Sequence, residues 1–159
     1  VLTGLGTSGG LLGRLLEPFK IDYRTQKRRV LTFVLDGKAT LPPLESLPLS
    51  PIADPSFVAN AASADRGAVT FGYSCGVCHG YEGISAGIAP DLRASEIPQD
   101  AETFASIVRD GGLVSAGMPR FDDFSAQQLA DIRQYIRTRA DDFRKGRDAA
   151  PHVSAAAGP

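Results

Sequence analysis

Cys75-Gly76-Val77-Cys78-His79 is the stretch of this sequence that says most about the fold. Two thiols at this spacing lie on one turn of the chain and can form thioethers to the two vinyl groups of a haem. The imidazole that follows can reach the iron from the same side. The pattern therefore predicts a covalently attached haem, bound through Cys75 and Cys78, with His79 as an axial iron ligand.

Two other uses of this cysteine pair stay open, a plain disulfide and part of a zinc site. A thioredoxin-like redox pair requires a βαβ setting, whereas helix and loop are expected on both sides here. Zinc needs four ligands, and the only other His or Cys in the chain is His152. We expect His152 to be a solvated histidine in a disordered tail, which leaves a zinc site short of ligands.

Met118 is the only methionine of the chain and the candidate for the second axial position. It stands in Gly117-Met118-Pro119, where Gly permits a close approach to a cofactor and Pro stiffens the segment that presents the sulfur. The alternative is a methionine that fills a gap in the core. With a haem present, the sequence predicts a His79 and Met118 ligand pair.

Two further residues are candidates for a supporting role around the haem. The carbonyl of Pro90 could accept a hydrogen bond from the free nitrogen of His79 and so fix its orientation, or Pro90 could be an ordinary loop proline. Arg93 could pair with a haem propionate, or it could be a surface arginine.

Three helices are expected around these residues. Ser63 is the expected cap of a helix over roughly residues 64–73, and a second helix over residues 101–110 should be closed by Gly111-Gly112. The third should run from Ser125, which with Gln128 forms a capping-box pattern, to about Phe143. Its apolar face consists of Leu129, Ile132 and Ile136.

The composition changes along the chain and divides it into four parts. Residues 1–40 contain a β-branched and aromatic run at 29–35, followed by a turn at Asp36-Gly37, which indicates the end of a larger β structure. Residues 41–60 are rich in proline and are expected to form an extended linker. Residues 61–145 form the helical domain, and 146–159 should be a disordered tail.

Length and charge exclude several classes of protein. The 159 residues suffice for one domain with a core, and a net charge of −1 with scattered Lys and Arg offers no face for nucleic acid. No apolar run approaches the ~18 residues of a transmembrane helix. The chain starts at Val1 and shows no signal peptide, so we expect a mature or excised piece.

Taken together, the motifs resemble those of a class I cytochrome c, over roughly residues 62–143. The resemblance is carried by Cys75-Gly76-Val77-Cys78-His79-Gly80, Ala89-Pro90-Asp91-Leu92-Arg93, Gly117-Met118-Pro119-Arg120-Phe121 and the last amphipathic helix. It implies a mostly α fold in which a few helices surround the haem and the first and last helices cross. The fold class is therefore a class I cytochrome c domain with a short β-containing N-terminal extension and a Pro-rich linker.

The segment from Arg28 to Pro43 resembles the exit from the propeller of a quinohaemoprotein alcohol dehydrogenase. In that family a Pro-rich linker leads to a C-terminal cytochrome c domain, and alcohol is oxidised at a pyrroloquinoline quinone (PQQ) bound with calcium in the propeller. Propeller blades of ~40–50 residues each do not fit into this chain. PQQ and calcium are thus expected only in a partner domain or subunit.

This resemblance implies that the chain takes electrons from reduced PQQ and passes them to an external acceptor such as a cytochrome, a copper protein or a quinone. It also implies a periplasmic location, because haem of this type is attached outside the cytoplasm. Two alternatives are a haem module that binds or senses small ligands in place of Met118, and an interaction module whose cysteines form a disulfide.

Overall fold

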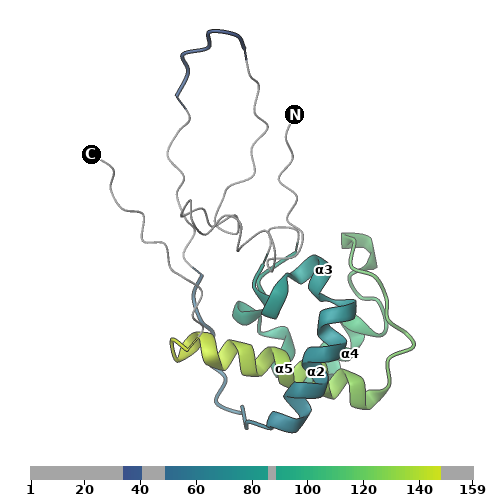
Figure 1. Cartoon of the computed structure of the whole chain (residues 1–159). Helices are drawn as coiled ribbons and strands as arrows, with labels where there is room; N and C mark the ends of the chain where they lie inside the picture. Colours follow the sequence, from purple (N-terminus) through teal and green to yellow (C-terminus); the bar gives the residue numbers. More distant parts are fainter. Residues whose placement is uncertain (1–33, 41–48, 86–88, 148–159) are drawn as a thin grey trace.

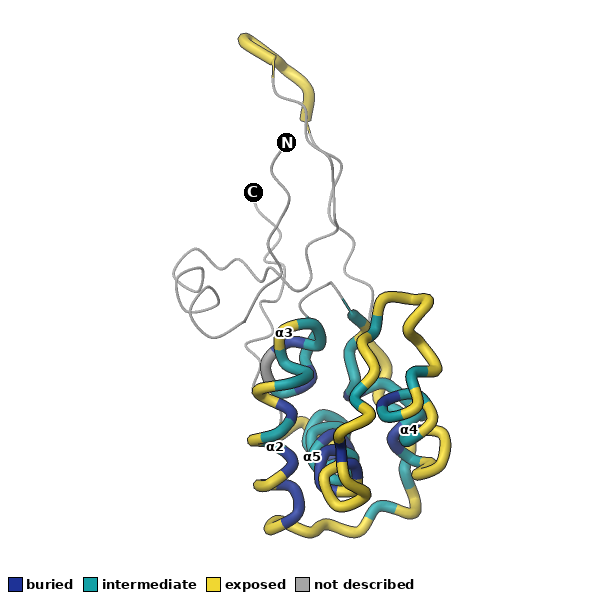
Figure 2. Tube along the Cα trace, turned by 90° about the vertical axis from the view of Figure 1, so that its right-hand side faces the viewer, coloured by how far each residue is buried: buried dark blue, intermediate teal, exposed yellow. Residues whose placement is uncertain are grey.

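The computed structural model of the chain describes residues 34–40, 49–85 and 89–147. Within these ranges the protein is helical and has no strand, which confirms the mostly α fold. The elements in chain order are α2 (Ala61–Ser74), α3 (Gly76–His79), η2 (Tyr81–Gly83), η3 (Leu92–Ala94), η4 (Ile97–Gln99), α4 (Ala101–Val108), η5 (Val114–Ala116) and α5 (Ala126–Arg144). The longest helix, α5, lies between α2 and α4 (Figures 1 and 2).

Helix α5 begins as the sequence predicts. The Ser125 side chain accepts a hydrogen bond from the Gln128 backbone N–H, and the Gln128 side chain accepts one from the Ser125 N–H, so the capping box is complete. The predicted apolar face of Leu129, Ile132 and Ile136 is buried. The helix ends at Arg144, one residue beyond the expected end.

Helix α2 begins earlier than the sequence predicts, and its cap is a different residue. Asn60, not Ser63, is the N-cap, and its side-chain oxygen accepts a hydrogen bond from the Ser63 N–H. Ser63 lies inside the helix and is buried, where its hydroxyl donates to Asp131 of α5. The prediction failed because a serine in the first turn can satisfy a distant carboxylate as well as its own backbone.

The crossing of α2 and α5 is very close. A Cβ atom added to Gly67 of α2 would lie 1.9 Å from the Asp131 backbone oxygen and 2.9 Å from Tyr135 Cβ. Only glycine leaves room for backbones this near to each other. The first and last helices of the domain therefore cross, as the resemblance implies (Figure 1).

Helix α4 completes the described core. Asp100 caps it by accepting from the Thr103 N–H, and the turn after it is closed by Gly111, at φ +85°, and a hydrogen bond from Gly112 N–H to Ser106 O. The helix ends at Val108, two residues before the predicted end. Its buried side chains join those of α2, α5 and the connecting loop in one cluster: Phe71, Phe104, Val108, Phe124, Leu129, Ile132 and Ile136.

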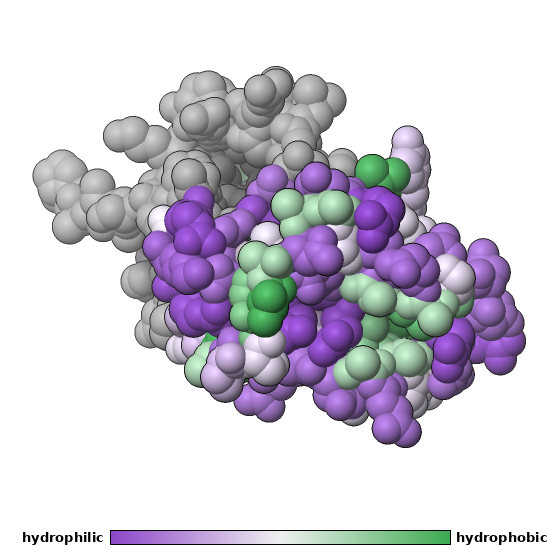
Figure 3. Space-filling view, turned by 90° about the horizontal axis from the view of Figure 1, so that it is seen from below, coloured by the Kyte–Doolittle hydropathy of each residue, from purple (hydrophilic) through white to green (hydrophobic). Residues whose placement is uncertain are grey.

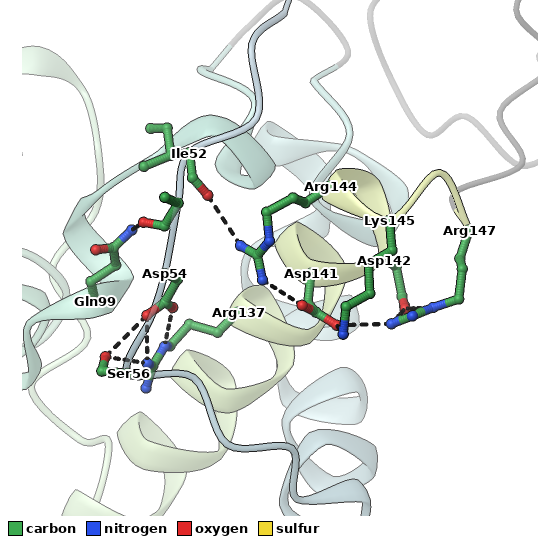
Figure 4. Close-up of polar contacts among 11 residues, drawn as sticks. Ile52, Asp54, Ser56, Gln99, Arg137, Asp141, Asp142, Arg144, Lys145 and Arg147 are labelled. Carbon is green, nitrogen blue, oxygen red and sulfur yellow. Dashed lines mark hydrogen bonds and ion pairs between the residues drawn. The ribbon is translucent and has the colours of Figure 1, made fainter.

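Residues 52–58, which we name the strap, lie along α5, contain a turn at Pro55-Ser56 and are attached to the helix by polar contacts (Figure 4). Arg137 donates to both carboxylate oxygens of Asp54, at 2.7 and 2.9 Å, and the two side chains are 8% and 6% exposed. Arg144 donates to Ile52 O at 3.1 Å, and Gln134 donates to Val58 O at 2.9 Å. The strap thus lies within the expected linker but belongs to the surface of the folded domain.

The described part of the N-terminal extension is a turn. Gly37 N–H donates to Val34 O at 3.2 Å, Asp36 has φ +59°, and Val34 and Leu35 are exposed. Most of the expected strand at 29–35, and the tail from 148 onward, lie outside the described residues.

The surface of the described part is mixed in character. On the face shown in Figure 3, apolar residues form small groups separated by hydrophilic ones. Across the described ranges no helix is both long and apolar enough to cross a membrane.

Candidate functional site

The C-x-x-C-H motif lies at the junction of α2 and α3. Cys75 is both the C-cap of α2 and the N-cap of α3. Its N–H donates to Phe71 O at 2.8 Å. His79 N–H donates to Cys75 O at 2.9 Å, which places the imidazole one turn after the first thiol. Gly80, at φ +80°, ends the short helix directly after His79. The two sulfurs and the ring are therefore presented by one continuous turn.

Both cysteines are free thiols in this structure. Burial, together with the neighbouring Cys78, raises the pKa of the Cys75 thiol to about 12. A thiol with such a pKa is protonated and uncharged at neutral pH.

The loop that contains Pro90 contacts the imidazole of His79. His79 Nδ1 lies 3.2 Å from Pro90 O. With a metal on Nε2, Nδ1 carries the proton and donates it to this carbonyl. The geometry supports the role that the sequence suggests for Pro90.

Met118 lies in the loop between α4 and α5, after the short helix η5. Gly117 precedes it at φ +92°, a conformation that favours glycine, and Met118 N–H donates to Leu113 O at 3.2 Å. A hydrogen bond from Phe121 N–H to Val108 O, at 3.0 Å, connects the loop to the end of α4. The Met118 side chain is half-buried and packs against the core cluster.

Arg93 occupies a buried position and forms an ion pair within its own loop. Its side chain is 7% exposed, and its Nη2 lies 2.8 Å from Asp91 Oδ2. Its guanidinium also lies over the Phe143 ring of α5, 4.6 Å from the centroid. It is therefore not the surface arginine of the alternative interpretation, and contact with a propionate stays a prediction.

These residues fit a haem c. Two thiols and an imidazole on one turn are the donor set that thioether attachment and axial ligation need, and a thioether sulfur is available on a separate loop. Four half-buried apolar side chains pack against the core cluster, and a porphyrin requires apolar surroundings of this type: Leu92, Ile97, Met118 and Phe121.

Comparison with known proteins agrees with this donor set. The family described as cytochrome C oxidase, cbb3-type, subunit III matches residues 62–136. The dehydrogenase subunit of alcohol dehydrogenase (quinone) from Gluconobacter oxydans (strain 621H) is 39% identical over 72% of this chain. The chain carries a cytochrome c domain. Haem c is accordingly its covalent cofactor, and electron transfer is its general function.

Two further comparisons concern the cytochrome c domain together with its flanking segments. Quinohemoprotein alcohol dehydrogenase ADH IIB of Pseudomonas putida is 35% identical over 95% of this chain. The solved structure of quinohemoprotein alcohol dehydrogenase ADHIIG from Pseudomonas putida HK5 is 34% identical over 69% of this chain, with a TM-score of 0.56. The chain spans 15% of the Gluconobacter relative, 22% of ADH IIB and 16% of the solved chain.

Several residues that shape the cytochrome c domain escaped the sequence reasoning. Gly67 has no motif around it, although a glycine inside a helical pattern is itself a sign of close packing. Asp54 and Arg137 form an ion pair although they lie far apart in the sequence, so no local pattern connects them. Asp91 stands inside the loop motif, but nothing in the sequence alone indicates which groups its carboxylate binds.

Proposed function

We propose that this cytochrome c domain receives electrons from reduced PQQ in a propeller domain or subunit of an alcohol dehydrogenase and delivers them to an external acceptor. The observation that carries the proposal is the similarity to ADH IIB over 95% of the chain, which includes the segment before the haem domain. PQQ and calcium belong to the partner. The acceptor is a cytochrome, a copper protein or a quinone in the periplasm.

In this proposal, Cys75 and Cys78 would hold the haem through two thioethers, and His79 and Met118 would ligate its iron. When bound, the haem iron supplies one-electron chemistry, and its ligands set the potential. Pro90 O holds the Nδ1 proton of His79, which fixes the tautomer and keeps Nε2 toward the metal. Gly117 and the hydrogen bond from Met118 N–H to Leu113 O hold the segment that presents the sulfur.

The attachment is tested by substituting the cysteines. Cys75→Ala or Cys78→Ala should remove one thioether each, His79→Ala should prevent a stable holoprotein, and the double cysteine variant should lose all haem on acid–acetone extraction. Expression in the cytoplasm, without the attachment machinery, should yield apoprotein. Haem that stays attached to the double variant would contradict the assignment.

The axial pair is tested by the weak near-infrared charge-transfer band that oxidised haem shows when methionine sulfur is bound. The wild type should have this band and Met118→Ala should lack it, whereas Met118→His should keep a six-coordinate iron at a lower potential. Val114→Ala, in the same loop, is a matched control that should retain the band. A wild type without the band, or with an open site that binds small gases, would favour a sensor module instead.

The partner is tested by mixing the oxidised holoprotein with a PQQ-loaded propeller and alcohol. Reduction of the haem should follow addition of the alcohol and should require both PQQ and calcium in the propeller. Slow reduction that does not depend on alcohol would contradict the proposed electron donor.

A further inference from the structure

The Asp91 carboxylate organises the loop that lies against His79. Its Oδ2 accepts from Ser85 N–H at 3.1 Å, and its Oδ1 accepts from Arg93 N–H at 3.1 Å. The Arg93 side chain adds two more bonds, from Nε to Oδ1 at 3.0 Å and from Nη2 to Oδ2 at 2.8 Å. Because the carboxylate is 11% exposed, these contacts are shielded from water and competing ions.

Pro90 is fixed on both sides by this arrangement. On its N-terminal side, Ser85 Oγ donates to Ala89 O at 2.7 Å. On its C-terminal side, Asp91 caps the short helix η3 through Arg93 N–H. Pro90 itself has a restricted φ and no N–H with which to anchor the loop. The position of its carbonyl therefore depends on the contacts made by its neighbours.

The loop is also attached to the rest of the domain through the same ion pair. Arg93 lies over the Phe143 ring near the end of α5, so the Asp91–Arg93 pair connects the loop to the longest helix. The pair carries no net charge. We therefore expect the pair to act on the His79 imidazole mainly through the position of the loop, and less through a long-range electric field.

We propose that Asp91 is a positioning residue that holds Pro90 O on His79 Nδ1 and in this way sets the reduction potential of the domain. The inference rests on the proposed function, since it requires His79 to ligate the haem iron. A hydrogen bond from Nδ1–H to a fixed carbonyl makes the imidazole a stronger donor and favours the oxidised state. A loosened carbonyl weakens this effect and raises the potential.

The test compares Asp91→Asn and Ser85→Ala in the haem-loaded chain. Two quantities are measured: the midpoint potential, and the rate at which the His79 Nδ1 proton exchanges with solvent in the reduced protein, by NMR. Asp91→Asn should favour the reduced form by up to about tenfold, equivalent to about 59 mV for one electron, and should accelerate the exchange. Ser85→Ala, which changes no charge, should move both quantities in the same direction by less.

Asp142→Asn is the matched control, because it also converts a carboxylate to an amide, but Asp142 pairs with Arg139 of α5 and with Arg147 just after that helix instead of with the loop. It should leave the exchange rate unchanged. A change in potential without faster exchange in Asp91→Asn would indicate a charge effect and overturn the inference, as would wild-type values for both quantities.

Two outcomes keep the test decisive. If Asp91→Asn fails to hold haem, Asp91→Glu decides, because it keeps the charge but displaces the carboxylate by one methylene from Ser85 N–H and Arg93 N–H. Wild-type potential and exchange in that variant reject the inference. Failure of the proposed function is recognised separately, because a wild type without covalent haem or without His79 ligation shows it in the optical spectrum before any loop variant is compared.

Discussion

Among the contacts of helix α5, those with α2 and with the strap differ in kind. Against α2 the contact is centred on a close approach, because Gly67 brings two backbones together with no side chain between them, and Ser63 and Arg66 donate to Asp131 beside it. Against the strap the contact is one of charge and hydrogen bonding, centred on Asp54 and Arg137. Two packed helices cannot separate without opening the core, whereas a segment on the surface can detach and be hydrated. We therefore expect that loss of the contact with α2 unfolds the whole domain, whereas loss of the contact with the strap releases only the strap.

The largest effect is expected from Gly67→Ala. The added Cβ would meet the backbone oxygen of Asp131, which cannot move away as the end of a flexible side chain can. We expect a loss of about 4 kcal/mol in the free energy of unfolding, measured by urea denaturation of the holoprotein. Gly72→Ala, in the same helix, is the control, because a Cβ there meets nothing within 4 Å. It should gain about 0.5–1 kcal/mol, and equal behaviour of the two variants would contradict the close crossing.

A smaller and more local effect is expected from Arg137→Gln. The substitution leaves Asp54 without its bidentate partner, but the strap can detach and expose the carboxylate to water, which limits the cost to about 1–2 kcal/mol. Hydrogen exchange should rise in the strap and stay unchanged at the helix crossing. The control Arg120→Gln removes an exposed pair with Asp122 and should change neither region. Unfolding of the whole domain by Arg137→Gln would contradict the distinction between the two contacts.

Acid should weaken both contacts, since each contains a carboxylate with a lowered pKa. Hydrogen bonding, chiefly from Arg66, lowers the pKa of Asp131 to about 2, and the Arg137 side chain lowers that of Asp54. A carboxylate whose pKa is lowered by folding stabilises the fold at pH values above its unfolded pKa of about 3.9. This stability is lost as the pH falls through the pKa of the folded state. In the Asp131→Asn variant, stability should depend less steeply on pH between about 4 and 2. An unchanged slope would show that Asp131 is not a source of acid sensitivity.

The smallest effect is expected from Arg144→Gln. It removes the hydrogen bond to Ile52 O but leaves the Asp54–Arg137 pair in place. Only the N-terminal end of the strap should become more sensitive to a protease, with no measurable change in the denaturation midpoint. Arg109→Gln, at the C-cap of α4 in an exposed pair with Asp110, serves as the control, and equal cleavage of the two variants would count against this anchor.

The fold was predictable where its signals are local. Ser125 and Gln128 stand in one turn and specify the start of α5, and the cofactor residues Cys75, Cys78 and His79 form one continuous motif. The start of α2 was predicted wrongly, because Ser63 and Asn60 are both good caps and the choice depends on Asp131, far away in the sequence. The partner of Asp54 was equally invisible, since Arg137 lies 83 residues away and the pairing depends on the complete fold.

The strap determines where the polypeptide enters the folded domain. Helix α2 starts at Ala61, but within residues 49–60 the chain already contacts α5 at Ile52, beside Arg144, and α5 ends at that same residue. The start of the strap and the end of α5 thus lie at one corner of the domain (Figure 4). Adjacent ends of this kind are what circular permutation and domain insertion require. A domain attached at a single corner can also turn as one rigid unit about that pivot, which leaves the helix crossing and the ligand-bearing loops undisturbed.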